Sequence, residues 1–397
     1  MNKHFFYLFS FLILFYACTS DDEVEMPPIV KNEVLVDHSV VKKISSQEVT
    51  AIYKELSKDL PKDQVPPITL GGVTVYKITY KTSYPGKADK ILASGSLAVP
   101  DDIPNNPIVS YQHGTITDSK EIPSLFASTK QNNFIAVLSA FGFYVSAPDY
   151  LGYGESKNEF HLYEHGESLA SASYDMLLAS REFLFSQKRN VGNKLFLSGY
   201  SEGGYATMAL HQYIEAKGKL TVTASAPGAG AYNKSNFALE VLSKNEDLPF
   251  MHSYLWVLAS YNYVYGINKP WSYYLNEPYD SAIDPKNPLS VFTATIATNP
   301  TKLFKKSFRD EILGKKDTPF NKALKDNDRF DWKANAPVRL YYGTADNYVY
   351  PSNSTTAYTA MKAKGSTVEL IPFKDKDHFT AADSYGISVL LQFFAMK

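Results

Sequence analysis

A serine flanked by glycines is the feature of this sequence that most directly suggests chemistry. Residues 199–203, within the stretch "LFLSGYSEGGYATMAL", match the pattern G-x-S-x-G around Ser201. An apolar run precedes the pattern and a predicted helix follows it, which is the strand–turn–helix context of a nucleophile elbow. The glycines allow a strained serine backbone and a close approach of the helix to the strand. Ser201 is therefore a candidate nucleophile.

A serine hydroxyl needs a base to take its proton, and the base needs a carboxylate to orient it. His378, in "FKDKDHFTAAD", is singled out among the histidines because it stands in the loop after the last predicted strand. Asp346, in "LYYGTADNYVYP", also follows a predicted strand directly, although aspartates in such loops are usually turn residues. The chain order Ser201, Asp346, His378 is the order of the α/β-hydrolase triad.

Alternating strand and helix patterns predict the scaffold that would position these residues. A period-two segment at 73–84 and a partner strand at 91–100 lead into a series of short apolar runs. The runs lie at residues 107–114, 143–149, 194–201, 220–228, 338–346 and 367–373. Such runs, separated by helical patterns, favour an α/β fold with a mostly parallel central sheet flanked by helices. The three candidate residues should then meet at one sheet edge, where ligands bind in such folds.

A long segment without strand signals, residues 231–336, interrupts this series. It far exceeds an ordinary connection, so we expect a mainly helical cap insertion in one α/β-hydrolase domain formed by residues 45–230 and 337–397. The insertion is rich in aromatic residues: Trp256, Tyr261, Tyr263, Tyr265, Trp271, Tyr273 and Tyr274. Two interpretations of these side chains stay open. They line an acyl pocket or stack on sugars, or they are the core of the cap itself.

The beginning of the chain carries the pattern of an export signal. Lys3 precedes an apolar run from Phe5 to Tyr16, which is shorter than the ~20 residues of a membrane span but suits a secretory signal. Cys18 and the acidic "SDDE" follow, and together they resemble a bacterial lipoprotein signal. The resemblance implies a signal peptide at 1–17, lipidation of Cys18 and a flexible tether at 18–44. We expect an outer-membrane lipoprotein, exposed at the cell surface and held by its lipid alone; the alternative is a secreted or periplasmic protein.

Charge and residue spacing argue against several other classes of function. Lys and Arg number 40 against 41 Asp and Glu, so nothing points to a nucleic-acid partner. A chain with one cysteine has no cysteine-based metal cluster. His161 and His165 are spaced i,i+4 but lack the H-E-x-x-H order of a zinc site. No metal or cofactor is therefore expected.

Four stretches together resemble the α/β-hydrolase superfamily over about residues 73–397: "YQHGT", "SAPDYLGYGES", "GYSEGGY", and "GTADNYVYP" with "DHF". Within it, the chain is most similar to the secretory lipase group. The resemblance implies that the backbone N–H groups of Thr115 and Glu202 form an oxyanion hole and that Asp149 is structural. The sequence departs from the group in placing Glu202, rather than a small or neutral residue, after the nucleophile.

These observations lead to the hypothesis of a serine carboxylic ester hydrolase, a lipase or esterase that acts on a small-molecule or lipid ester through a covalent acyl-enzyme. Three alternatives stay open. One is an esterase that removes acyl groups from polysaccharides. Another is a serine peptidase of the prolyl-oligopeptidase type, although the chain before residue 73 leaves little room for the large N-terminal β-domain of those enzymes. The third is an inactive surface binding module.

Overall fold

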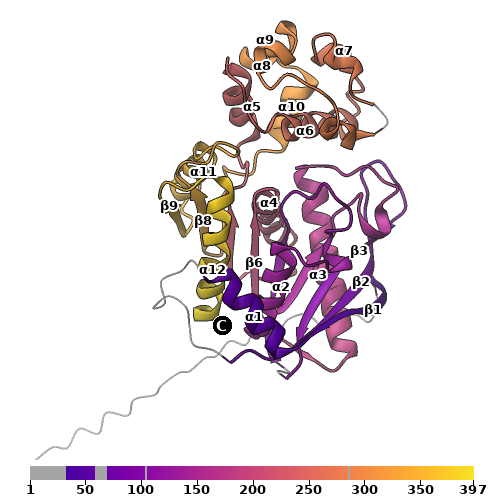
Figure 1. Cartoon of the computed structure of the whole chain (residues 1–397), viewed down its shortest axis with the longest axis vertical. Coiled ribbons are helices and arrows are strands. Elements are labelled where there is room, and N and C mark those ends of the chain that lie inside the picture. Colours follow the sequence, from indigo (N-terminus) through magenta and orange to yellow (C-terminus); the bar gives the residue numbers. More distant parts are fainter. Residues whose placement is uncertain (1–32, 59–68, 103–104, 285–286) are drawn as a thin grey trace, which may run out of the picture.

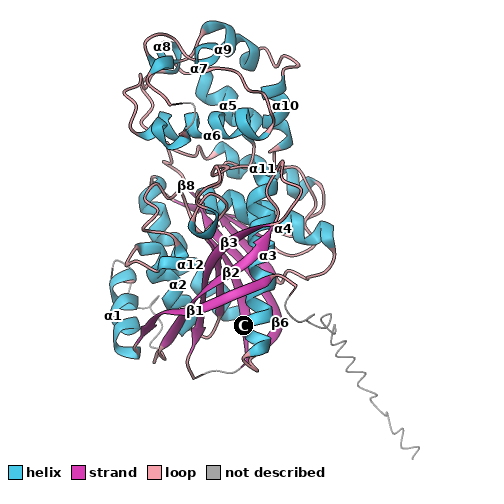
Figure 2. Cartoon of the chain, turned by 90° about the vertical axis from the view of Figure 1, so that its right-hand side faces the viewer, coloured by secondary structure: helices cyan, strands magenta, loops and turns pink. Residues whose placement is uncertain are grey.

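The computed structural model describes residues 33–58, 69–102, 105–284 and 287–397, which form a sheet layered between helices and a helical cap (Figures 1 and 2). The sheet has nine strands in the order β1-β2-β3-β5-β4-β6-β7-β8-β9. The strands are β1 (Leu35–Ile44), β2 (Val73–Thr82), β3 (Ile91–Pro100), β4 (Asn105–Gln112), β5 (Tyr144–Pro148), β6 (Asn190–Tyr200), β7 (Ala224–Gly228), β8 (Val338–Gly343) and β9 (Val368–Phe373).

Strand pairing divides the sheet into an antiparallel and a parallel part. The pairs β1–β2, β2–β3 and β3–β5 are antiparallel. The pairs from β5 through β4, β6, β7 and β8 to β9 are all parallel. The prediction of an α/β fold with a mostly parallel sheet is therefore confirmed.

Helices cover both faces of the sheet: α1 (Ser46–Leu56), α2 (Lys130–Ala140), α3 (Gly166–Ser186), α4 (Glu202–Lys217), α11 (Ser352–Ala363) and α12 (His378–Met396). Successive residues of β6 point to opposite faces, as the pleat of a strand requires. Phe196 belongs to the apolar cluster that includes α1, α2 and α12. Leu197 belongs to the cluster that includes α3 and α4. Both faces of β6 are thus buried, which explains its continuous apolar sequence.

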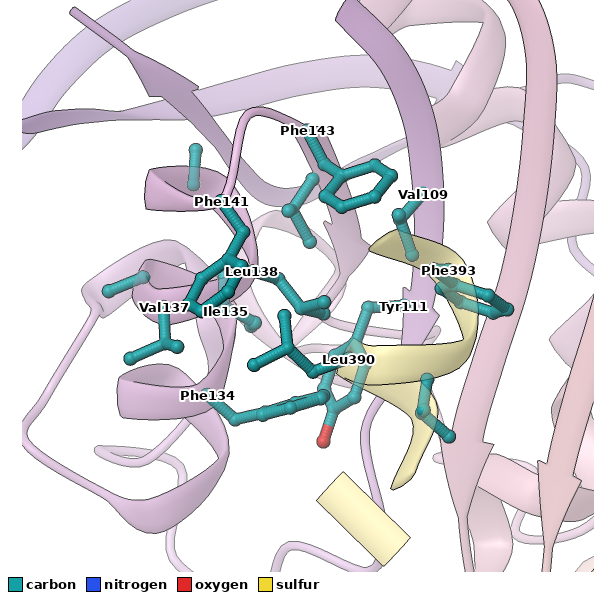
Figure 3. Packing of buried hydrophobic residues seen from close by; sticks show 14 of the residues in the cluster. Val109, Tyr111, Phe134, Ile135, Val137, Leu138, Phe141, Phe143, Leu390 and Phe393 are labelled. Atoms are coloured by element: carbon teal, nitrogen blue, oxygen red, sulfur yellow. The ribbon is translucent and has the colours of Figure 1, made fainter. Parts of the chain in front are cut away.

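The packing of α2 and α12 shows how one of these faces is filled (Figure 3). Phe134 and Leu138 of α2 lie beside Leu390 of α12 in the same buried cluster. Tyr111 of β4 lies between these helices and the sheet, with its ring 5.6 Å from that of Phe134. This cluster fixes α12, whose first residue is His378.

The first strand corrects the predicted tether. Residues 35–44 do not form a flexible linker but the edge strand β1, which pairs along its length with β2. The Glu182 carboxylate accepts hydrogen bonds from the backbone N–H groups of Glu33, Val34 and Leu35. Most side chains of β1 are exposed, so the strand lacks the apolar alternation that would reveal it in the sequence. The predicted signal peptide, Cys18 and the start of the tether lie outside the described residues.

Residues 231–336 form the expected helical insertion, with α5 (Lys234–Ser243), α6 (Met251–Val264), α7 (Trp271–Tyr274), α8 (Pro300–Leu303), α9 (Lys306–Leu313) and α10 (Pro319–Asp326). These helices lie together beyond one end of the sheet, next to α4 and α11. The C-terminus lies at the opposite end (Figure 1). Within the described residues, no helix is long and apolar enough to cross a membrane. Helix α1 begins with a capping box formed by Ser45 and Glu48.

Candidate active site

Ser201 occupies a strained turn between β6 and α4. Its backbone has φ 61° and ψ −124°, a conformation that costs a residue with a side chain on the order of 1–3 kcal/mol. The neighbouring glycines permit the turn, because a Cβ on Gly203 would lie 2.1 Å from the carbonyl oxygen of Gln112. A Cβ on Gly204 would lie 2.0 Å from the carbonyl oxygen of Gly228. The nucleophile elbow expected from the sequence is therefore present in its geometry.

Ser201, His378 and Asp346 lie in one hydrogen-bonded chain. His378 Nδ1 is 2.7 Å from Asp346 Oδ2, and His378 Nε2 is 2.9 Å from Ser201 Oγ. A carboxylate only accepts, so Nδ1 carries the proton and Nε2 is free to accept the serine proton. Asp346 Oδ1 accepts the backbone N–H groups of Tyr348 and Val349, each at 2.9 Å. These bonds hold the carboxylate in place.

Hydrogen bonds join α12 to the ends of β6 and β7, next to the serine. The hydroxyl of Tyr385 accepts from the N–H of Gly199 at 2.8 Å and lies 2.6 Å from the carbonyl oxygen of Ala226. The hydroxyl of Tyr200 donates to the carbonyl oxygen of His378 at 2.7 Å. Residues on α12 thus fix the end of β6 and the histidine at the same time.

The loop after β4 runs beside Ser201. A Cβ built on Gly114 would lie 3.8 Å from that of Ser201, so the two chains are in contact there. The N–H of Gly114 donates to Gln131 Oε1 at 2.6 Å, and the Thr115 hydroxyl lies 2.8 Å from that of Tyr163. Within the described residues, the N–H groups of Thr115 and Glu202 have no acceptor. The oxyanion role of these two N–H groups therefore stays a prediction.

Two acidic side chains near the serine are fully buried. Asp149 accepts from the Ser94 hydroxyl at 2.6 Å and from the N–H of Ser124 at 2.8 Å. Burial raises the pKa of Asp149, and these hydrogen bonds oppose the shift. Its contacts join the end of β5 to β3 and to the short 3-10 helix Pro123–Leu125, as expected of a structural residue. Glu202 turns its side chain away from the solvent, to His161.

A mainly apolar cavity extends from Ser201 into the cap. It encloses about 750 Å³, including its open mouth. The cap contributes Phe237, Val241, Leu242, Val257, Leu258, Phe308, Phe320 and Leu324 to its wall. The wall also contains a buried ion pair between Lys234 and Glu164. Burial lowers the pKa of Lys234, while the Glu164 carboxylate opposes that shift.

The aromatic residues of the cap that stood out in the sequence do not line this cavity. Trp256, Tyr261 and Tyr274 are fully buried in the cluster that forms the core of the cap. Tyr263 is instead 49 % exposed and stacks on Phe160 at 4.7 Å. The interpretation of these residues as the core of the cap is the one that the packing supports, whereas the residues around the cavity had no signal in the sequence.

Comparison with known proteins identifies the fold. The sequence matches no protein-family model and no curated protein. A candidate hydrolase from Legionella pneumophila is 25 % identical, with a TM-score of 0.80 over 92 % of this chain and 98 % of that chain. The rice cell wall degrading esterase LipA from Xanthomonas oryzae is 23 % identical, with a TM-score of 0.74 over 91 % of this chain and 95 % of LipA.

A more distant neighbour is lipase A from Candida antarctica, at 14 % identity and a TM-score of 0.61 over 88 % of this chain and 78 % of that chain. The strand order, the elbow at the end of a parallel strand and these neighbours agree. The protein has an α/β-hydrolase fold, and its structural neighbours include an esterase and a lipase.

Proposed function

We propose that the protein is a serine carboxylic ester hydrolase in which Ser201, His378 and Asp346 act as a catalytic triad. The observation that carries this proposal is the unbroken hydrogen-bond chain through His378, 2.9 Å to the serine and 2.7 Å to the aspartate. A base within this distance of a hydroxyl at the mouth of a cavity meets the geometric requirement for nucleophilic catalysis.

In the first half of the proposed reaction, Ser201 Oγ attacks the ester carbonyl carbon and its proton passes to His378 Nε2. Asp346 stabilises the imidazolium that forms, and the N–H groups of Thr115 and Glu202 donate to the oxyanion. Collapse of the tetrahedral intermediate breaks the bond to the alcohol, which leaves with the proton of His378. In the second half, His378 takes a proton from water and the hydroxide adds to the acyl-enzyme. The second tetrahedral intermediate then collapses: the bond between the acyl carbon and Ser201 Oγ breaks, His378 returns its proton to Oγ, and the acid is released.

The cavity supports an aliphatic acyl group as the part of the substrate that enters the cap. Its wall is mainly apolar, which suits an aliphatic chain better than a sugar or a peptide. Burial of each methylene would contribute about 0.8 kcal/mol to binding. A lipase-like or esterase activity on fatty acyl esters is therefore favoured over deacylation of polysaccharides and over peptide hydrolysis.

Hydrolysis of p-nitrophenyl esters from acetate to dodecanoate tests this function directly. We expect measurable turnover that rises from acetate to medium-length chains. Ser201→Ala should lower kcat by about 10⁵- to 10⁶-fold, as removal of a triad serine does elsewhere. An optimum at acetate would contradict the fatty acyl assignment, and turnover unchanged in the Ala variant would contradict the triad.

A further inference from the structure

The side chain of Glu202 presents an unusual arrangement next to the nucleophile. Its carboxyl group is only 1 % exposed. Oε1 lies 3.1 Å from His161 Nε2, whereas Oε2 has no hydrogen-bond partner within the described residues. A buried carboxylate with a free oxygen is costly unless a partner compensates its charge. Because Glu202 directly follows Ser201, the charge of its carboxyl group would affect a reaction at the serine.

Hydrogen bonding fixes the number of protons that the pair holds. His161 Nδ1 lies 2.7 Å from the carbonyl oxygen of Leu151, which only accepts, so Nδ1 carries a proton. The contact between His161 Nε2 and Glu202 Oε1 then requires one further proton between the two atoms. The pair is either an imidazolium with a carboxylate or an imidazole with a carboxylic acid. Its net charge is zero in both forms.

The other ionisable groups around Glu202 make no direct contact with its carboxyl group within the described residues. Groups that interact electrostatically with Glu202 are His113, Tyr150, Tyr153, Tyr163, Lys234 and Tyr348. Burial lowers the pKa of His113, which favours its neutral form, and the ammonium of Lys234 is already paired with Glu164. His161 itself is enclosed by aromatic rings, with Tyr153 at 4.6 Å and Trp256 at 5.1 Å. Among the ionisable groups that the structure describes, His161 is the one that contacts the Glu202 carboxyl group directly.

We propose that His161 is a positioning residue that acts through Glu202: it keeps the carboxyl group beside the nucleophile within an electrically neutral pair, so that negative charge can develop in the oxyanion hole. The inference rests on the proposed function only in requiring an anionic intermediate at Ser201. An uncompensated carboxylate several ångströms from the oxyanion would repel it. At an effective dielectric constant of about 20, such a repulsion corresponds to a rate loss of about 10- to 100-fold.

The test uses variants at both members of the pair and a probe that does not depend on the natural substrate. An alkyl fluorophosphonate forms a bond between Ser201 Oγ and phosphorus while the P–F bond breaks, fluoride leaves and the serine proton passes to His378. The phosphoryl oxygen becomes more negative in this step. The second-order rate of modification is read by intact-protein mass spectrometry for wild type, His161→Gln, Glu202→Gln and the double variant.

His161→Gln keeps a hydrogen-bond donor but cannot share a proton, so labelling should slow by about 10- to 100-fold. The double variant restores a neutral pair of amides, and we expect it to recover at least half of that loss on a logarithmic scale. Glu202→Gln should keep more of the rate than His161→Gln. With the ester substrates, the loss in His161→Gln should fall on kcat and leave KM nearly unchanged.

His211 provides a matched control, because it forms a second buried histidine–glutamate pair, 2.9 Å from Glu215, within α4. His211→Gln should lower the melting temperature without slowing the labelling of Ser201. The inference is overturned if His161→Gln labels as fast as wild type, or if the double variant is as slow as His161→Gln. Wild type that is labelled at Ser201 but hydrolyses no ester would contradict only the proposed function. Wild type that is not labelled would overturn both.

Discussion

The sheet and the cap meet at Ser201, but they are built by different kinds of contact. On the sheet side, β6 is held in parallel register between β4 and β7 by backbone hydrogen bonds. On the cap side, in the part of the chain that the structure describes, the one β-bridge outside the named strands joins Leu275 and Phe304. The cap is held mainly by packed side chains on helices, with isolated backbone hydrogen bonds such as that from Leu248 N–H to the Thr298 carbonyl oxygen. The sheet thus fixes the positions of the proposed triad, whereas the cap sets the shape of a cavity.

This difference predicts that changes on the sheet side reduce the rate for all substrates. Asp346→Asn should show the largest effect, because an amide in place of the carboxylate favours the wrong tautomer of His378 and leaves its charged form unstabilised. We expect kcat to fall by about 10⁴-fold with every p-nitrophenyl ester. Asp375→Asn, in an exposed position of the loop between β9 and α12, is the control. A loss confined to long-chain esters would contradict the division between sheet and cap.

The stability of the protein should depend on pH through a histidine, His165, where the α/β domain meets the cap. His165 accepts the N–H of Ser168 as the N-cap of α3, and its ring lies 5.6 Å from that of Tyr265 in the cap. Burial, together with Arg329, lowers the pKa of His165 to about 4. The unfolded chain takes up this proton near pH 6.5, so stability is lost as the pH falls from about 6.5 to 4. The loss amounts to about 3 kcal/mol.

His165→Asn keeps a capping acceptor but does not titrate. We therefore expect its free energy of unfolding to fall less steeply than that of wild type between pH 7 and pH 4, as measured by denaturant titration. His165→Ala also lacks the cap and should be about 1 kcal/mol less stable than His165→Asn at pH 7. Parallel curves for wild type and His165→Asn would show that this histidine does not couple protons to folding.

Substitutions in the cap should have the smallest effect on activity, and one that depends on the chain length of the ester. Leu324 lies on α10 in the wall of the cavity, and Leu324→Trp would fill part of it. We expect kcat/KM for dodecanoate to fall by about 10-fold, while the value for acetate changes little, since each excluded methylene forfeits about 0.8 kcal/mol. The larger side chain could strain the core by about 1–3 kcal/mol, so the milder Val257→Phe is measured beside it.

Leu313→Trp is the matched control for the cap, because Leu313 is 37 % exposed on α9 and does not line the cavity. It should leave the chain-length profile as in wild type. An equal loss for short and long esters in Leu324→Trp would mean that the cap contributes to the chemical step and not to the choice of the acyl group.

The candidate site residues could be predicted from the sequence because each stands after a strand that has a recognisable apolar pattern. Ser201, Asp346 and His378 each follow a strand, and parallel strands bring such residues to one edge. The edge strand β1 was missed because its exposed side chains carry no apolar period. The pair of His161 and Glu202 was missed for another reason. Its members are 41 positions apart, and their contact depends on how a loop folds over the elbow, which no local pattern encodes.

The bracing of β6 by α12 has a consequence for the order in which the molecule forms. Tyr385 reaches back 186 positions to hold Gly199, and His378 reaches back 177 positions to Ser201. Contacts of such long range form late, because the entropy of closing the loop must be met first. The whole cap lies within that loop. We therefore expect a nascent or partly folded chain to carry Ser201 without its proposed base until α12 docks.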